Sequence, residues 1–165
     1  MTGSFTDLGR LGARLVGGWT TRSTHPLVPG TVVLGGTTFE WLTGRQFIVA
    51  RSWTDHPDFP DAISIIGDTD GLQLHWFDSR GVHRTYAVTV SDQGWEAIRH
   101  SPPSPSDFSQ RLPLSFADDG NTMFGTTQIS HDDATWEDDL VITYQRQADE
   151  LAHWRTDRSS TRRRV

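Results

Sequence analysis

Short runs of alternating apolar and polar residues, separated by turn-forming residues, make up most of this chain. Between Gly18 and Arg146 there are about ten such runs, roughly 8–14 residues apart, and none has the spacing of a long helix. A period of two predicts half-buried strands, and the lack of helices between the runs argues against a parallel sheet. The pattern is typical of an up-and-down barrel or a sandwich, and we predict an all-β, ten-stranded antiparallel barrel. The expected strands are residues 18–25, 31–42, 45–53, 62–67, 72–78, 82–90, 95–100, 108–116, 121–130 and 137–146.

The start of the chain has a different period. Within residues 6–16, leucines recur at helical spacing: Leu8, Leu11 and Leu15. Two glycines inside this segment lower its helix propensity, so we expect a short helix that depends on packing and closes one end of the barrel. The alternative is a frayed N-terminal arm. The pair Gly17–Gly18 then starts the first strand, whose Trp19 is expected to form the floor of the barrel.

The chain is expected to be one domain in three parts. Residues 1–16 form the helix packed on the barrel, residues 17–147 form the barrel, and residues 148–165 form a C-terminal turn with a basic, flexible tail. The glycine pair Gly35–Gly36 inside the second strand predicts a bulge or a tight bend.

Composition narrows the function classes. With 7 Trp and 8 Phe but only 35% hydrophobic residues, much of the core must be aromatic. Cysteine is absent, which excludes disulfides and thiolate chemistry. A net charge of −6 argues against a nucleic-acid surface. No stretch has the length and apolarity of a membrane span or the order of a signal peptide, so a cytoplasmic protein is expected, as a monomer or a homodimer.

Several short motifs, taken in order, resemble a known group of proteins. The Gly17–Trp19 start of the first strand, with Arg146 at the end of the last, is similar to the calycin superfamily of lipocalins and fatty-acid-binding proteins. Three runs more closely resemble a bacterial lipocalin-like family of unknown function: Phe39–Phe47, Trp76–Gly81 and Ser130–Arg146. The resemblance implies a calycin-like barrel in which Arg146 lies over the Trp19 ring at the closed end. It carries function only by analogy.

Parity along the strands gives the candidate site. Alternate residues of a barrel strand point inward, so polar residues that share the parity of apolar ones are candidates for contact with a ligand. A lumen of aromatic rings with a few Arg, His, Tyr and carboxylate groups predicts a small hydrophobic or amphipathic ligand with an acidic head. Arg84 shares the parity of Tyr86, whereas the inward faces of the second and sixth strands stay open. The candidate ligand-binding residues are His25, Glu40, Trp41, Arg51, Trp76, Asp78, Tyr86, Arg99 and Arg111.

Two alternatives use the same lumen. A cofactor-free proton-transfer enzyme of the isomerase or cyclase type would rely on a subset of the candidates: His25, Glu40, Asp78 and Tyr86. A haem protein would resemble the nitrobindins, distant relatives that hold haem through an axial histidine, and His153 would be the candidate here. No spacing typical of a metal site occurs, and His75 and His83 are expected on the outer face, so no cofactor and no metal are predicted.

Overall fold

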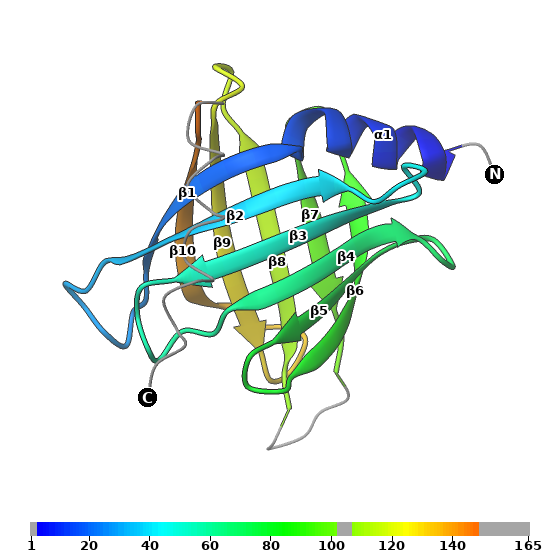
Figure 1. The fold of residues 1–165 in the computed structure, drawn as a ribbon. Helices are drawn as coiled ribbons and strands as arrows, with labels where there is room; N and C mark the ends of the chain where they lie inside the picture. Colours follow the sequence, from blue (N-terminus) through cyan, green and yellow to red (C-terminus); the bar gives the residue numbers. More distant parts are fainter. Residues whose placement is uncertain (1–2, 102–106, 149–165) are drawn as a thin grey trace, which may run out of the picture.

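Ten antiparallel strands form a closed barrel preceded by one helix in the computed structural model, which describes residues 3–101 and 107–148 (Figure 1). Each strand pairs with its neighbours in sequence, and β1 pairs with β10 to close the cylinder. The predicted fold class is confirmed, and no strand end differs from the expected one by more than two residues. The elements are α1 Gly3–Leu15, β1 Gly17–Thr24, β2 Val33–Trp41, β3 Phe47–Thr54, β4 Ala62–Asp68, β5 Leu72–Asp78, β6 His83–Val90, β7 Gly94–Arg99, β8 Ser109–Phe116, β9 Thr122–Ser130 and β10 Glu137–Arg146.

The residues that form the turns explain why the strand ends could be predicted from the sequence. Gly71 and Gly81 have φ angles of 89° and 84°, and they lie in the tight turns after β4 and β5. These angles are in the left-handed region, which glycine adopts without a steric penalty. The Asp78 carboxylate also accepts hydrogen bonds from the backbone N–H groups of Arg80 and Val82, which fixes the β5–β6 turn.

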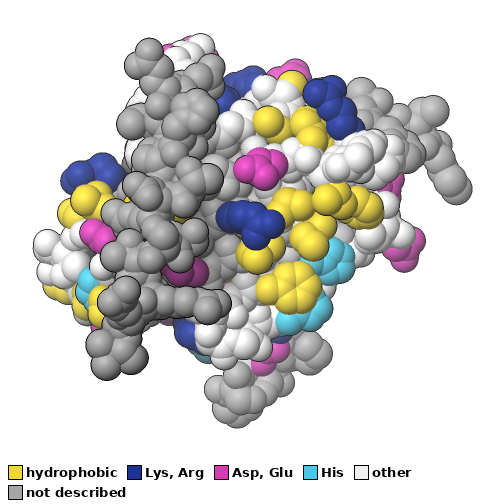
Figure 2. All heavy atoms as spheres, viewed as in Figure 1, with side chains coloured by type: hydrophobic (Ala, Val, Ile, Leu, Met, Phe, Trp, Pro, Cys, Tyr) yellow, Lys and Arg dark blue, Asp and Glu magenta, His cyan; other side chains and the backbone are white. Residues whose placement is uncertain are grey.

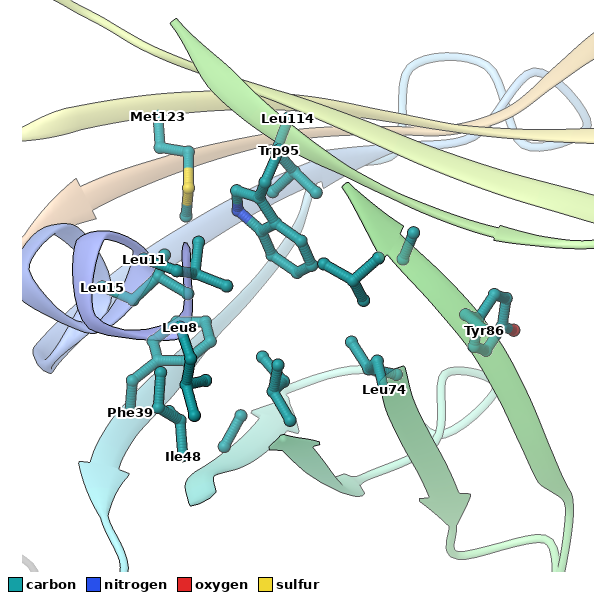
Figure 3. Close-up of a cluster of buried hydrophobic side chains, with 14 of the residues drawn as sticks. Leu8, Leu11, Leu15, Phe39, Ile48, Leu74, Tyr86, Trp95, Leu114 and Met123 are labelled. Atoms are coloured by element: carbon teal, nitrogen blue, oxygen red, sulfur yellow. The ribbon is translucent and has the colours of Figure 1, made fainter. Parts of the chain in front are cut away.

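The helix α1 seals one end of the barrel with its leucines. Leu11 and Leu15 are fully buried and Leu8 is 2% exposed, and all three point at the barrel interior (Figure 3). They meet large side chains from several strands: Trp19, Phe39, Ile48, Ile66, Trp95 and Met123. Because this end is filled by large apolar groups from the helix and the strands, the main core of the molecule lies here.

An arginine from the last strand ties the helix to the first strand. The Arg146 guanidinium lies 4.2 Å from the centre of the Trp19 ring and donates to the carbonyl oxygens of Arg14 and Val16, the latter at 2.9 Å. The Trp19 indole N–H in turn donates to the Leu15 carbonyl at 2.8 Å. The expected Arg146–Trp19 contact is confirmed, and it satisfies carbonyl groups that a helix end leaves without partners.

The bulge that the glycine pair of β2 predicted is absent. The glycine pair Gly35–Gly36 causes no register shift, because β2 pairs continuously with both β1 and β3. These glycines instead permit close packing, since a Cβ at Gly35 would lie 2.2 Å from the Trp53 carbonyl oxygen. The register shift lies in β10, between Asp138 and Leu140.

The outer surface carries apolar and histidine side chains above β3 to β6 (Figure 2). Ile63 and Phe77 are 40% and 44% exposed there. The His83 ring stacks on the Phe77 ring at 4.5 Å and on the His75 ring at 6.1 Å. His75 and His83 therefore lie outside the lumen, as expected. Of the described helices, none is long and apolar enough to span a membrane.

Candidate functional site

The lumen contains a cavity of about 500 Å³ that reaches the end of the barrel opposite α1. Residues of the segments that follow β1, β3 and β5 line its mouth, among them His25, His56, Phe59 and Arg80. A second hollow of about 300 Å³ beside the β6–β7 turn has Glu96 as the only ionisable residue in its lining. The lumen cavity therefore offers the richer chemistry for recognition.

Small side chains explain why the middle of the barrel is hollow. The closed end is filled by Trp, Phe, Ile and Leu, whereas the next inward positions carry residues that leave space. These small lining residues are Thr21, Ser23, Thr37, Ser52 and Gly125. Side chains of this size cannot reach across a ten-stranded barrel, so the lumen stays open above the aromatic floor.

A His–Asp pair crosses the mouth of the cavity. The extra residue at the register shift in β10 is Asp139, and its carboxylate lies 2.9 Å from Nε2 of His25. A bulge of this kind redirects a side chain that regular pairing would point elsewhere. The backbone N–H of Leu27 donates to Nδ1 of His25, so that nitrogen is unprotonated and Nε2 donates to Asp139. While both bonds hold, neither ring nitrogen is available to take a proton from a ligand.

Asp78 is a structural anchor at the same end. Its side chain is fully buried, and it accepts hydrogen bonds from Arg80 at 2.7 Å and from the Trp76 indole N–H at 3.4 Å. Burial alone would raise the pKa of Asp78, but the donors from Arg80, the Val82 backbone and Trp76 outweigh it and lower the pKa to about 2. Asp78 is therefore an anion whose donors hold Trp76 and Arg80, both of which line the cavity.

Three side chains form a hydrogen-bonded group on the β6–β8 side of the cavity, and we call it the Arg84 group: Arg84, Tyr86 and Gln110. The amide oxygen of Gln110 accepts from the Tyr86 hydroxyl at 2.6 Å and from the Arg84 guanidinium at 3.1 Å. The guanidinium also lies 4.7 Å from the centre of the Phe108 ring. Burial raises the pKa of Tyr86, so its phenol is neutral and acts as a donor.

Arg84 differs from the other arginines near the mouth. Arg80 pairs with Asp78 and Arg99 pairs with Asp107, but Arg84 has no carboxylate within ion-pair distance in residues 3–101 and 107–148. A guanidinium has five N–H donors in a planar fork, and it suits a carboxylate or another oxyanion. The Arg84 group therefore presents a positive charge and free donors to the lumen.

The structure places three of the nine candidates in the cavity lining, namely His25, Trp76 and Tyr86. Asp78 lies at the rim behind Trp76, as its parity indicated. Arg99 points inward by parity but donates to Asp107 and to the Phe108 carbonyl, outside the cavity lining.

The other four candidates lie elsewhere. Glu40 and Arg51 are exposed on the outer face, and the expected inward direction of Arg51 was wrong because Ile48 and Ala50 are the buried residues of β3. Trp41 packs at the closed end against Gly12 of the helix. Arg111 also faces outward, with its guanidinium 4.4 Å from the centre of the Trp136 ring and its Nε donating to Gln128 at 2.7 Å.

Gln110 and Tyr144 are among the polar lining residues that sequence reasoning missed. Gln110 shares the parity of Leu112 and Leu114, and Tyr144 shares that of Arg146, which faces inward over the floor. The parity rule alone was enough to find both.

The described part of the chain has no set of metal ligands, because no group of three or more His, Asp or Glu side chains converges there. His153, the candidate axial ligand of the haem alternative, lies outside the described residues, as does most of the expected C-terminal turn and tail.

The fold and site together define a closed antiparallel β-barrel with a sealed floor and a cavity that reaches one end. Comparison with protein-family models and with curated proteins finds no match. Among solved structures, the chain is similar to the crystal structure of Rv2717c from M. tuberculosis, with a TM-score of 0.59 and 16% sequence identity. The match covers 86% of this chain and 98% of that chain. A similarity at this level of identity shows the shared barrel fold.

Proposed function

We propose that this protein is a calycin-like barrel that binds a small amphipathic molecule with an anionic head. The observation that carries the proposal is a hollow lumen of about 500 Å³ into which Arg84 presents a guanidinium without a carboxylate partner in the described residues. Arg84 is half-buried, and a positive charge there without a counter-ion among the described residues is unfavourable, so an anionic ligand would supply the missing charge. The contact of Arg146 with Trp19 at the closed end supports the calycin relationship.

The apolar part of the ligand would contact the rings of the cavity. Trp76, Phe59 and the ring of His25 line it near the mouth, and Leu112, Leu114 and Ile142 line it further round the barrel. Cavities that bind small molecules are mostly apolar and have a few placed polar groups, and this lining has that character. The geometry at His25 does not favour the proton-transfer alternative, because both ring nitrogens are hydrogen-bonded within the protein.

Two dyes that differ only in a charged group test the proposal. 1-Anilinonaphthalene-8-sulfonate carries a sulfonate, and N-phenyl-1-naphthylamine has the same rings without it. Both dyes fluoresce more strongly in an apolar site, so each titration gives a dissociation constant. We expect both to bind and the sulfonate to bind more tightly, because a hydrogen bond to a charged group contributes about 1.5–3 kcal/mol.

The variant Arg84→Met removes the positive charge and leaves the cavity in place. It should weaken the sulfonate dye about ten- to a hundredfold and leave the neutral dye within about twofold, since methionine keeps most of the apolar bulk. Arg51→Met is the matched control, because Arg51 is exposed on the outer face. The proposal is wrong if neither dye binds, or if Arg84→Met and Arg51→Met affect the sulfonate dye equally. Native mass spectrometry of freshly purified protein then identifies any co-purified acid.

A further inference from the structure

Tyr144 lies inside the barrel on the side away from the Arg84 group. Tyr144 on β10 is paired with Thr21 on the neighbouring strand β1, and both residues line the cavity. In the barrel order β10 is four strands from β6, which carries Arg84 and Tyr86. In a ten-stranded barrel this separation places the two tyrosines on nearly opposite walls.

The two phenols of the lumen differ in their hydrogen bonding. The Tyr86 hydroxyl donates to Gln110 at 2.6 Å, whereas the Tyr144 hydroxyl makes no hydrogen bond within the described part of the chain. Burial raises the pKa of Tyr144 to about 12, so the phenol is protonated at neutral pH and offers an O–H donor. This donor faces the cavity without a protein acceptor among the described residues.

Two hydroxyl side chains beside Tyr144 share this property. Thr21 and Ser23 are 8% and 6% exposed, both line the cavity, and neither has a side-chain hydrogen bond to a described residue. By contrast, the hydroxyls of Thr37 and Ser52 lie 3.0 Å apart and bond each other. We call Tyr144, Thr21 and Ser23 the hydroxyl wall. These hydroxyls are open to the cavity rather than enclosed by protein, so a polar group of a bound molecule can pair with them.

The geometry points to the hydroxyl wall as a second polar subsite, which takes an uncharged oxygen on the body of the ligand. This inference rests on the proposed function, in which the anionic head lies at Arg84. Hydroxyls donate to and accept from a ligand hydroxyl or carbonyl, and a neutral site of this kind has no charge for a second anion. Because apolar side chains such as Leu112, Leu114 and Ile142 also line the cavity, the ligand class is an oxygen-bearing amphipathic acid rather than a plain hydrocarbon-chain acid.

Naphthoates with and without a ring hydroxyl test this subsite. 2-Naphthoate has the rings and the carboxylate, and its 5-, 6- and 7-hydroxy derivatives add one hydroxyl at different positions. Isothermal titration calorimetry gives the affinity of each for the wild-type protein. We expect at least one hydroxy isomer to bind about three- to tenfold more tightly than 2-naphthoate, which is the range for one neutral hydrogen bond.

The variant Tyr144→Phe removes only the hydroxyl. It should abolish the preference for that hydroxy isomer while 2-naphthoate binds as before, which also shows that the variant is folded. Tyr86→Phe is the matched control: it removes a phenol that already bonds Gln110, so it should change both affinities alike and preserve their ratio.

The inference is overturned if no hydroxy isomer gains affinity over 2-naphthoate, or if the gain persists in Tyr144→Phe. Failure of the proposed function gives a different result, because neither 2-naphthoate nor the sulfonate dye would then bind.

Discussion

Two glycines of α1 make a matched test of how the helix seals the barrel. A Cβ at Gly12 would lie 2.0 Å from Cζ2 of Trp41, and two more atoms of that ring lie within 2.8 Å. A Cβ at Gly9, one turn earlier, would meet nothing within 4 Å. The same change to alanine therefore gains helix propensity at both positions but creates a clash at only one.

The magnitudes can be worked from these contacts. Glycine to alanine in a helix interior stabilises by about 0.8–1 kcal/mol. Gly9→Ala should keep this gain, about 0.5–1 kcal/mol. At position 12 the rigid indole must move by more than 1 Å to restore van der Waals contact, on the order of the displacements that make overpacking cost about 1–3 kcal/mol. The ring of Trp41 packs on the core and has the Arg45 guanidinium above it at 5.9 Å. After the gain in helix propensity is subtracted, Gly12→Ala should therefore destabilise the fold by up to about 2 kcal/mol.

Urea unfolding followed by tryptophan fluorescence and by far-ultraviolet circular dichroism gives both free energies. We expect Gly9→Ala to raise the free energy of unfolding and Gly12→Ala to lower it. The melting temperatures of the two variants should differ by several degrees, at about 2–4 °C per kcal/mol for a protein of this size. Stabilisation by Gly12→Ala equal to that by Gly9→Ala would show that Trp41 moves freely, and would refute the account of close helix–barrel packing.

Three further outcomes are expected. Trp19→Ala removes the floor of the barrel and the surface on which Arg146 rests, and it should cost about 3–5 kcal/mol in urea unfolding. Because the pKa of Asp78 is about 2 in the folded state, below the ordinary 3.8, its stabilising effect is complete above that ordinary value and is lost as the pH falls towards 2. Asp78→Asn should therefore be less stable than wild type near neutral pH, and unfolding curves of the two proteins should converge in acid. Thr37→Leu should narrow the lumen, so that 1-anilinonaphthalene-8-sulfonate binds more weakly although circular dichroism shows the barrel intact.

The fold was predictable because its determinants are local. Turn residues such as Gly71 and Gly81 mark each strand end, and the leucine spacing of the first residues marks the helix. The inward face of β3 was not predictable in the same way. The run Phe47–Ala50 is apolar on both faces, so alternation gives no direction, and the partly apolar outer surface above β3 to β6 removes the usual contrast.

The candidate site was predictable where parity is unambiguous. The alternation of inward and outward residues along the strands identified Tyr86, Trp76 and His25. The same alternation, counted from Arg146, would also identify Tyr144. Asp139 does not follow, because the register shift in β10 depends on how two strands pair and leaves no mark in the spacing of residues. Likewise, the absence of a carboxylate beside Arg84 among the described residues is a property of the packed lumen and not of any short stretch of sequence.

The contact of Arg146 with Trp19 and Val16 at the closed end has a consequence for synthesis on the ribosome. Arg146 donates to the Val16 carbonyl across a separation of 130 residues. During translation the strand that carries Trp19 is therefore made long before its partner emerges, and the nascent sheet keeps an unpaired margin until nearly the whole described chain has left the exit tunnel. The cylinder therefore cannot close before β10 has emerged, and until then β1 lacks one of its two partner strands.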